Sequence, residues 1–109
     1  METIKFEKNW NGKLNCKAFF TIRLKNDEKY KVNQIYKIDE QGSNYDRIGV
    51  IRDITDFPIR RLNNQMSLLD MGVSPDLGIE ILKEYYPSVS DWENEEFSLI
   101  TIEIIAEMY

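Results

Sequence analysis

The feature that most constrains the fold is the segment Phe97-Ser98-Leu99-Ile100-Thr101-Ile102-Glu103-Ile104-Ile105, which is rich in β-branched residues and almost continuously apolar. A strand with one face in water alternates apolar and polar residues, whereas a strand covered on both faces reads as a near-continuous apolar run. The segment therefore predicts a central strand of a sheet, with much of both faces buried.

Alternation of apolar and polar residues predicts four shorter strands earlier in the chain. They cover Thr3 to Phe6, Lys17 to Leu24, Tyr30 to Ile38 and Tyr45 to Thr55. Turn-forming residues at Asn9 to Asn15 and at Gln41 to Asn44 separate them. Pro58, which has no backbone N–H to donate, is expected to end the fourth strand.

Two helices are predicted between residues 62 and 86. Leu62, Met66 and Leu69 recur at helical spacing, and Gly72 stands where a left-handed residue would close the first helix. Ser74-Pro75-Asp76 suits the start of a second helix, which Pro87 ends. The apolar stripe expected on the second helix consists of Leu77, Ile81, Leu82 and Tyr85. Together these elements predict an α+β fold, a small mixed or antiparallel β-barrel packed with two helices, and one domain over residues 1–109.

Composition excludes several classes of site. The chain has no histidine and a single cysteine, Cys16, so it can hold neither a Ser-His-Asp or Cys-His pair nor a His/Cys zinc site, and we expect no metal and no cofactor. No glycine-rich phosphate loop is present. No apolar run approaches the ~20 residues that cross a bilayer, and no signal peptide is evident, so we expect a cytoplasmic protein with no membrane partner.

Charge is segregated along the chain, although the net charge is −5. Residues 1–37 hold nine Lys/Arg and four Asp/Glu, whereas residues 38–109 hold five Lys/Arg and fifteen Asp/Glu. The N-terminal third therefore offers the basic surface that an anion such as RNA needs. The acidic remainder, including the run from Asp91 to Glu96, suits either solvated surface or a basic protein partner.

The strand from Lys17 to Leu24 is the best candidate for a site. In a regular strand Lys17, Phe19, Thr21 and Arg23 share one face, while Phe20, Ile22 and Leu24 point into the core. An amine, an aromatic ring, a hydroxyl and a guanidinium in one row suit contact with a polar ligand. Arg23 can grip a phosphate or a base edge, and Trp10 or Phe19 can stack on a base.

In this order of elements the chain resembles the ASCH domain, a PUA-like β-barrel family associated with RNA. The resemblance covers nearly the whole chain and depends on short motifs in the right order. These are Thr21-Ile22-Arg23, Tyr30 to Tyr36, the strand at Ile48 to Ile54, Gly72-Val73-Ser74, Tyr86-Pro87 and the terminal strand. The family hallmark is Gly-x-Lys-x-x-Thr-x-Arg. Thr21 and Arg23 fit it, whereas Lys17 lies four residues before Thr21 instead of three. Asn15 stands where an aligned glycine would precede Lys17, and Asn33 stands where the next strand has a glycine.

The resemblance implies a domain that binds RNA or a modified nucleoside in a cleft between barrel and helices. One branch of the family is similar to small amidohydrolases that deacetylate N4-acetylcytidine with a Lys, this Thr and an acid from the helical region. The corresponding residues here are Lys17, Thr21 and Asp70, provided that a bend or bulge brings Lys17 toward Thr21. Three interpretations therefore stay open: a nucleoside- or RNA-binding domain, an amidohydrolase, and an acidic protein-binding module.

Overall fold

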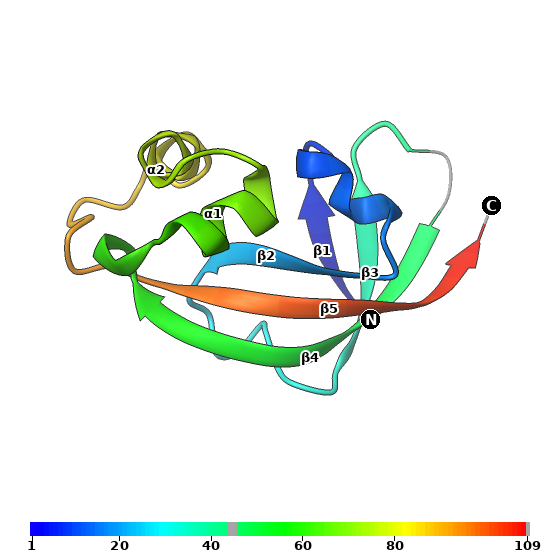
Figure 1. The fold of residues 1–109 in the computed structure, drawn as a ribbon. Coiled ribbons are helices and arrows are strands. Elements are labelled where there is room, and N and C mark those ends of the chain that lie inside the picture. Colours follow the sequence, from blue (N-terminus) through cyan, green and yellow to red (C-terminus); the bar gives the residue numbers. More distant parts are fainter. Residues whose placement is uncertain (44–45, 109) are drawn as a thin grey trace.

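The computed structural model describes residues 1–43 and 46–108, and Figure 1 shows its fold. Its strands are β1 (Glu2–Phe6), β2 (Ala18–Leu24), β3 (Ile35–Glu40), β4 (Asp46–Pro58) and β5 (Glu96–Met108). Its helices are α1 (Asn64–Met71) and α2 (Pro75–Tyr85), with two short 3₁₀ segments, η1 (Trp10–Asn15) and η2 (Ile59–Arg61). Asn44 and Tyr45, at the predicted start of the fourth strand, lie outside the described residues.

The five strands form one curled sheet in the order β1-β3-β4-β5-β2. β1 pairs with β3 in parallel, and every other neighbouring pair is antiparallel. The ladder between β4 and β5 shifts register at Ile48/Gly49 and again at Ile51/Asp53, and such irregularities bend a sheet. At Gly49 a Cβ would lie 2.8 Å from the Ile102 side chain, so a glycine permits this close packing. The predicted α+β class with a small mixed sheet is confirmed, as a half-barrel whose edges are β1 and β2.

β5 is the central strand that its apolar sequence predicts, because it lies between β4 and β2. Its alternate residues serve two cores. Ile100, Ile102 and Ile104 pack inside the curl with residues of β1 and β3, and Phe97 packs in a second core with residues of α1 and α2. Figure 1 shows the two helices above one end of the sheet and β1 with η1 above the other. The free edge of β2 runs between these two groups.

The ends of the helices agree with the sequence more closely than their buried faces do. Gly72 closes α1 in the left-handed conformation, with φ 72°, and Ser74 and Pro75 begin α2 as predicted. The predicted buried stripe of α2 is confirmed at Leu82 but wrong at Leu77 and Tyr85, which are 52% and 37% exposed, because the helix turns Gly78 inward. Within the described part of the chain, no helix is long and apolar enough to cross a membrane.

The predicted strand Tyr30 to Ile38 is wrong in its first half, because β3 begins only at Ile35. Asn33 has φ 68°, a left-handed conformation that interrupts an extended strand, and its N–H donates to the Ile51 carbonyl. A similar difference occurs at β2, which begins at Ala18, so that Lys17 precedes the regular strand.

Gly72 offers a test of how α1 contacts η1. Gly72 and Gly42 have φ 72° and 84°, so replacing either with alanine costs about 1–2 kcal/mol of backbone strain. A Cβ on Gly72 would also lie 3.1 Å from the Asn11 side chain, whereas a Cβ on Gly42 would meet no atom of residues 1–43 or 46–108 within 4 Å. We therefore expect Gly72→Ala to lower the free energy of unfolding in urea more than Gly42→Ala does. Equal losses would contradict a tight contact between η1 and α1.

Candidate functional site

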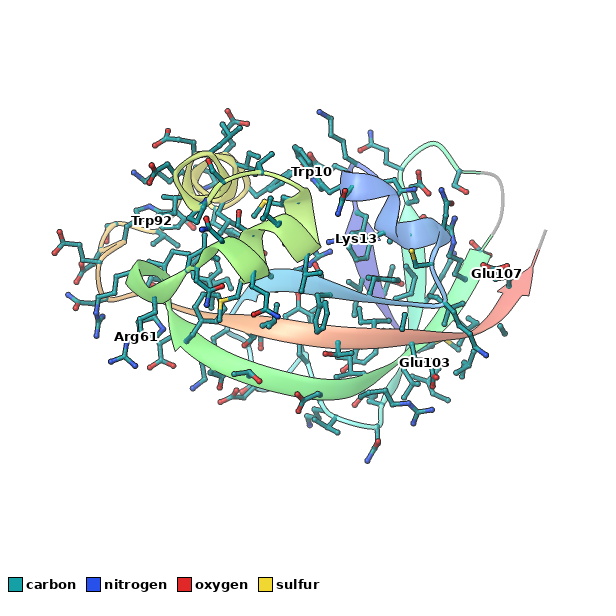
Figure 2. All side chains as sticks on the ribbon, in the orientation of Figure 1. Trp10, Lys13, Arg61, Trp92, Glu103 and Glu107 are labelled. Carbon is teal, nitrogen blue, oxygen red and sulfur yellow. The ribbon has the colours of Figure 1, made fainter. Side chains whose placement is uncertain are left out.

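A cavity of about 240 Å³ lies where the free edge of β2 meets η1, the end of β1 and both helices. Its polar and charged lining residues are Lys5, Glu7, Lys8, Lys13, Thr21, Arg23 and Asp70, and its apolar and aromatic ones are Phe6, Trp10, Ile22, Met71, Leu82, Tyr85 and Tyr86. Figure 2 shows Trp10 at the level of α2, with Lys13 below it toward β2. The cavity therefore lies between the two cores, with a polar floor and aromatic walls.

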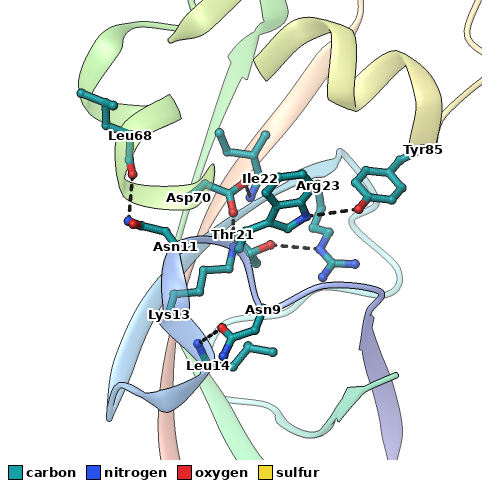
Figure 3. A network of polar contacts seen from close by, with 11 residues as sticks. Asn9, Asn11, Lys13, Leu14, Thr21, Ile22, Arg23, Leu68, Asp70 and Tyr85 are labelled. Atoms are coloured by element: carbon teal, nitrogen blue, oxygen red, sulfur yellow. Dashed lines mark hydrogen bonds and ion pairs between the residues drawn. The ribbon is translucent and has the colours of Figure 1, made fainter. Parts of the chain in front are cut away.

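Asp70, in the last turn of α1, joins three segments at the floor of this cavity. One carboxylate oxygen pairs with the Lys13 ammonium, and the other accepts a hydrogen bond of 3.0 Å from the backbone N–H of Ile22. Among the described strands β2 pairs only with β5, so without Asp70 this N–H at its free edge would lack a partner in that part of the chain. Figure 3 shows the carboxylate between the Lys13 side chain and β2. Asp70 thus fixes α1, η1 and β2 relative to one another.

The turn-rich segment η1 directs Lys13 into the interior. Asn11 and Gly12 are left-handed, with φ 57° and 66°, so the chain folds back on itself before Lys13. The Asn9 side chain accepts a hydrogen bond of 2.8 Å from the Leu14 N–H, and the Asn11 amide donates to the Leu68 carbonyl at 3.2 Å. These two bonds hold η1 to itself and to α1, and they place Lys13 at the cavity.

Lys13 is 4% exposed, and burial lowers the pKa of its ammonium below the ordinary value of 10.5. The charge of Asp70 and its hydrogen bond act in the opposite direction, while the nearby Arg23 lowers the pKa further. Burial is the largest of these effects, because removing an ammonium from water penalises its charged form. At a given pH, a larger fraction of Lys13 is neutral than of a solvated lysine.

Arg23 and Thr21 project into the cavity from β2. The Arg23 Nε donates to the Thr21 hydroxyl oxygen at 3.1 Å, which leaves the hydroxyl proton for a second partner. The guanidinium lies 4.4 Å from the centre of the Phe6 ring. In residues 1–43 and 46–108, no carboxylate forms an ion pair with Arg23. The Tyr30 hydroxyl lies within hydrogen-bonding reach of Arg23, so the donors that Thr21 and Tyr30 do not use can serve a ligand.

Trp10, at the start of η1, also lines the cavity. Its indole N–H donates to the Tyr85 hydroxyl at 3.1 Å, and the Lys8 ammonium lies 4.8 Å from the centre of its ring. The indole is thus held by a residue of α2 and covered on one side by a cation. A flat ring held in this way suits stacking or edge contact with a planar ligand.

The cavity brings together four of the six residues predicted from the sequence: Trp10, Thr21, Arg23 and Asp70. The predicted role of Lys17 in the site is wrong, because it precedes β2, is exposed, and does not line the cavity; the Ile104 N–H donates to its carbonyl at 2.6 Å. The register of β2 runs unshifted from Ala18 to Leu24, so no bulge brings Lys17 toward Thr21. Phe19 is on the predicted face, but its ring packs edge-on against Phe6 at 5.8 Å and is buried in the core. It is therefore not available for stacking on a base.

Lys13 is the functional candidate that sequence reasoning missed. It lies in the loop from Asn9 to Asn15, where turn residues predict that the chain bends but not which side chain turns inward. A lysine surrounded by asparagines and a glycine is expected to be exposed to solvent. The one available signal was the pair of residues tolerant of left-handed φ, Asn11 and Gly12, directly before Lys13.

We compared the chain with protein-family models, with curated proteins and with solved structures, and none of the three comparisons finds a match. Among the described residues, no group of three or more Cys, Asp or Glu side chains is placed to hold a metal ion.

The ion pair at the floor of the cavity can be tested by removing its negative charge. Asp70→Asn keeps an oxygen for the Ile22 N–H but leaves the Lys13 ammonium buried without a counter-charge. We expect a loss of about 3–5 kcal/mol in the free energy of unfolding, measured by urea denaturation. Adding Lys13→Met removes the orphaned charge, so the double variant should recover part of this loss. Additive losses in the double variant would show that the two side chains do not stabilise each other.

Proposed function

We propose that this chain is an ASCH-like, PUA-like domain that binds RNA or a modified nucleoside in the cavity between the half-barrel and the helices. The observation that carries the proposal is Arg23. Its guanidinium lies at the cavity, stacked on Phe6 and without a carboxylate partner among the described residues. A planar fork of donors held in this way suits base edges and phosphate oxygens, which accept paired hydrogen bonds.

The other walls of the cavity suit a nucleoside. Trp10 and Tyr86 supply aromatic surface, and Thr21 supplies a hydroxyl that can donate to a carbonyl oxygen of a base. The Lys13–Asp70 pair adds a second donor and acceptor set at the floor. Apolar walls with a few convergent polar groups are the usual composition of a small-molecule site.

One backbone conformation is compatible with the ASCH resemblance. Asn33, which stands where the family has a glycine in the next strand, is left-handed, with φ 68°. Asparagine is among the few residues other than glycine that adopt this conformation readily. Lys13, in η1, lines the cavity for which Lys17 was predicted, but it lies eight residues before Thr21, whereas the hallmark places its lysine three residues before the threonine.

A second candidate function is hydrolysis of an N4-acylated cytosine, and the specific observation in its favour is Lys13. Burial lowers the pKa of this amine, and Figure 3 shows its side chain reaching toward Asp70 beside Thr21. A neutral amine is a competent general base, whereas a solvated lysine is almost fully protonated near pH 7.

The reaction would proceed by proton transfer through this group. The neutral Lys13 amine takes a proton from water or from the Thr21 hydroxyl, and the resulting oxygen nucleophile adds to the acetyl carbonyl carbon. The bond from that carbon to N4 then breaks, and the amino group of cytosine leaves with a proton returned by Lys13. With water the products are cytidine and acetate directly; an acetylated Thr21 would need a water molecule to release acetate. Arg23 offers donors for the developing oxyanion.

Binding can be tested by replacing Arg23. We expect Arg23→Ala to abolish binding of cytidine or a short RNA, measured by isothermal titration calorimetry, because the fork of donors is lost. Arg52→Ala is the matched control, since Arg52 pairs with Glu103 on an exposed part of the sheet and does not line the cavity. Circular dichroism should show both variants folded. Unchanged affinity in Arg23→Ala would end the proposal.

Hydrolysis can be tested with N4-acetylcytidine, by following release of cytidine. We expect the rate to rise with pH as Lys13 loses its proton, with a midpoint below the ordinary lysine value of 10.5. Lys13→Arg keeps a positive charge for Asp70 but cannot lose it, so activity should disappear while the fold remains. Absence of turnover by the native protein at high concentration rules out this substrate.

A further inference from the structure

The charge of the cavity lining is opposite in sign to that of the whole chain. Four lining residues, Lys5, Lys8, Lys13 and Arg23, are cationic, and two, Glu7 and Asp70, are acidic, although the chain has a net charge of −5. Asp70 is already engaged by Lys13. A concave surface with excess positive charge and low-dielectric walls concentrates a positive potential at its opening.

The cations at the opening are not neutralised by the protein. In the described part of the chain, neither Lys5 nor Lys8 forms an ion pair with a carboxylate. Both are exposed, and Lys8 lies over Trp10, while Arg23 lies over Phe6. The aromatic rings position Lys8 and Arg23 without neutralising their charges, so that their N–H groups can bind an anion.

The volume of the cavity limits how much of a ligand it can enclose. About 240 Å³ is less than the roughly 300–1,000 Å³ of pockets that enclose a drug-sized ligand, so it can enclose only one small planar group, such as a base. Anything attached to that group must lie at the opening, where Lys5 and Lys8 are.

We propose that the ligand is a phosphorylated nucleoside whose base enters the cavity and whose phosphate lies at the opening against Lys5 and Lys8. This inference rests on the proposed function and adds to it that the group bound at the opening is a phosphate. A free nucleotide and a nucleotide within an RNA strand present the same chemistry, and the experiment distinguishes them.

The test compares the affinities of the full chain for cytidine, cytidine 5′-monophosphate and pentacytidylate RNA by calorimetry at one fixed ionic strength. We expect the monophosphate to bind about tenfold or more tightly than cytidine, as one charge-assisted contact provides. A further gain with the pentamer would identify a strand as the source, and no gain would identify a free nucleotide. Either result supports the proposal.

Two matched double variants test whether the preference for phosphate comes from lysines at the opening or from the overall charge of the protein. In the double variant Lys5→Gln with Lys8→Gln, the affinity for cytidine 5′-monophosphate should fall to that for cytidine. The affinity for cytidine itself should stay nearly unchanged. Lys31→Gln with Lys37→Gln removes the same charge away from the cavity and should keep the preference for phosphate. Equal affinities of the native protein for cytidine and its monophosphate, or a preference that survives Lys5→Gln with Lys8→Gln, would overturn the inference while leaving nucleoside binding intact. Failure of all three probes to bind would refute the proposed function itself.

Discussion

The Asp70 carboxylate is the contact on which the rest of the site depends. It neutralises the buried Lys13 ammonium and accepts the Ile22 N–H at the free edge of β2, so a single side chain of α1 fixes both η1 and the sheet. A half-barrel that does not close leaves a row of unpaired backbone groups at its edge strands, and these must find other partners. Here one of those partners is the acid that also completes the polar floor of the cavity. Asp70 therefore both satisfies the edge of the sheet and supplies the negative charge at the floor of the cavity.

Local sequence rules determine most of the elements. The continuous apolar run around Ile100 and Ile102 correctly predicts the central strand, and the left-handed Gly72 correctly predicts where α1 ends. The rules fail where two requirements compete. Alternation of apolar residues suggests a strand from Tyr30, but the left-handed Asn33 delays β3 until Ile35. On α2, contact with α1 buries Gly78, which has no side chain to contribute to a hydrophobic pattern.

In the candidate site, sequence reasoning succeeds for residues in the regular strand and fails for residues in the turn before it. Thr21 and Arg23 lie on one face of β2, as strand geometry requires, and both reach the cavity. Lys17 was assigned to that face by extending the strand one residue too far, and Lys13 was missed because the direction of a side chain in an irregular turn depends on distant contacts such as that between Asn11 and Leu68. Sequence periodicity carries no information on such contacts. The acidic protein-binding module, which would use the acidic residues of positions 38–109, stays a prediction.

The connectivity of the sheet affects how this domain can acquire its shape. In the sheet formed by the described residues, β1 pairs only with β3 and β2 only with β5, so the strands on either side of the cavity pair with segments that follow much later in the chain. Non-local pairing of this kind slows folding, because loop closure costs entropy before any contact compensates for it. During translation, β2 has no strand to pair with until residues 96–108 have left the ribosome. The cavity at the edge of β2 therefore forms only after β5 has been synthesised.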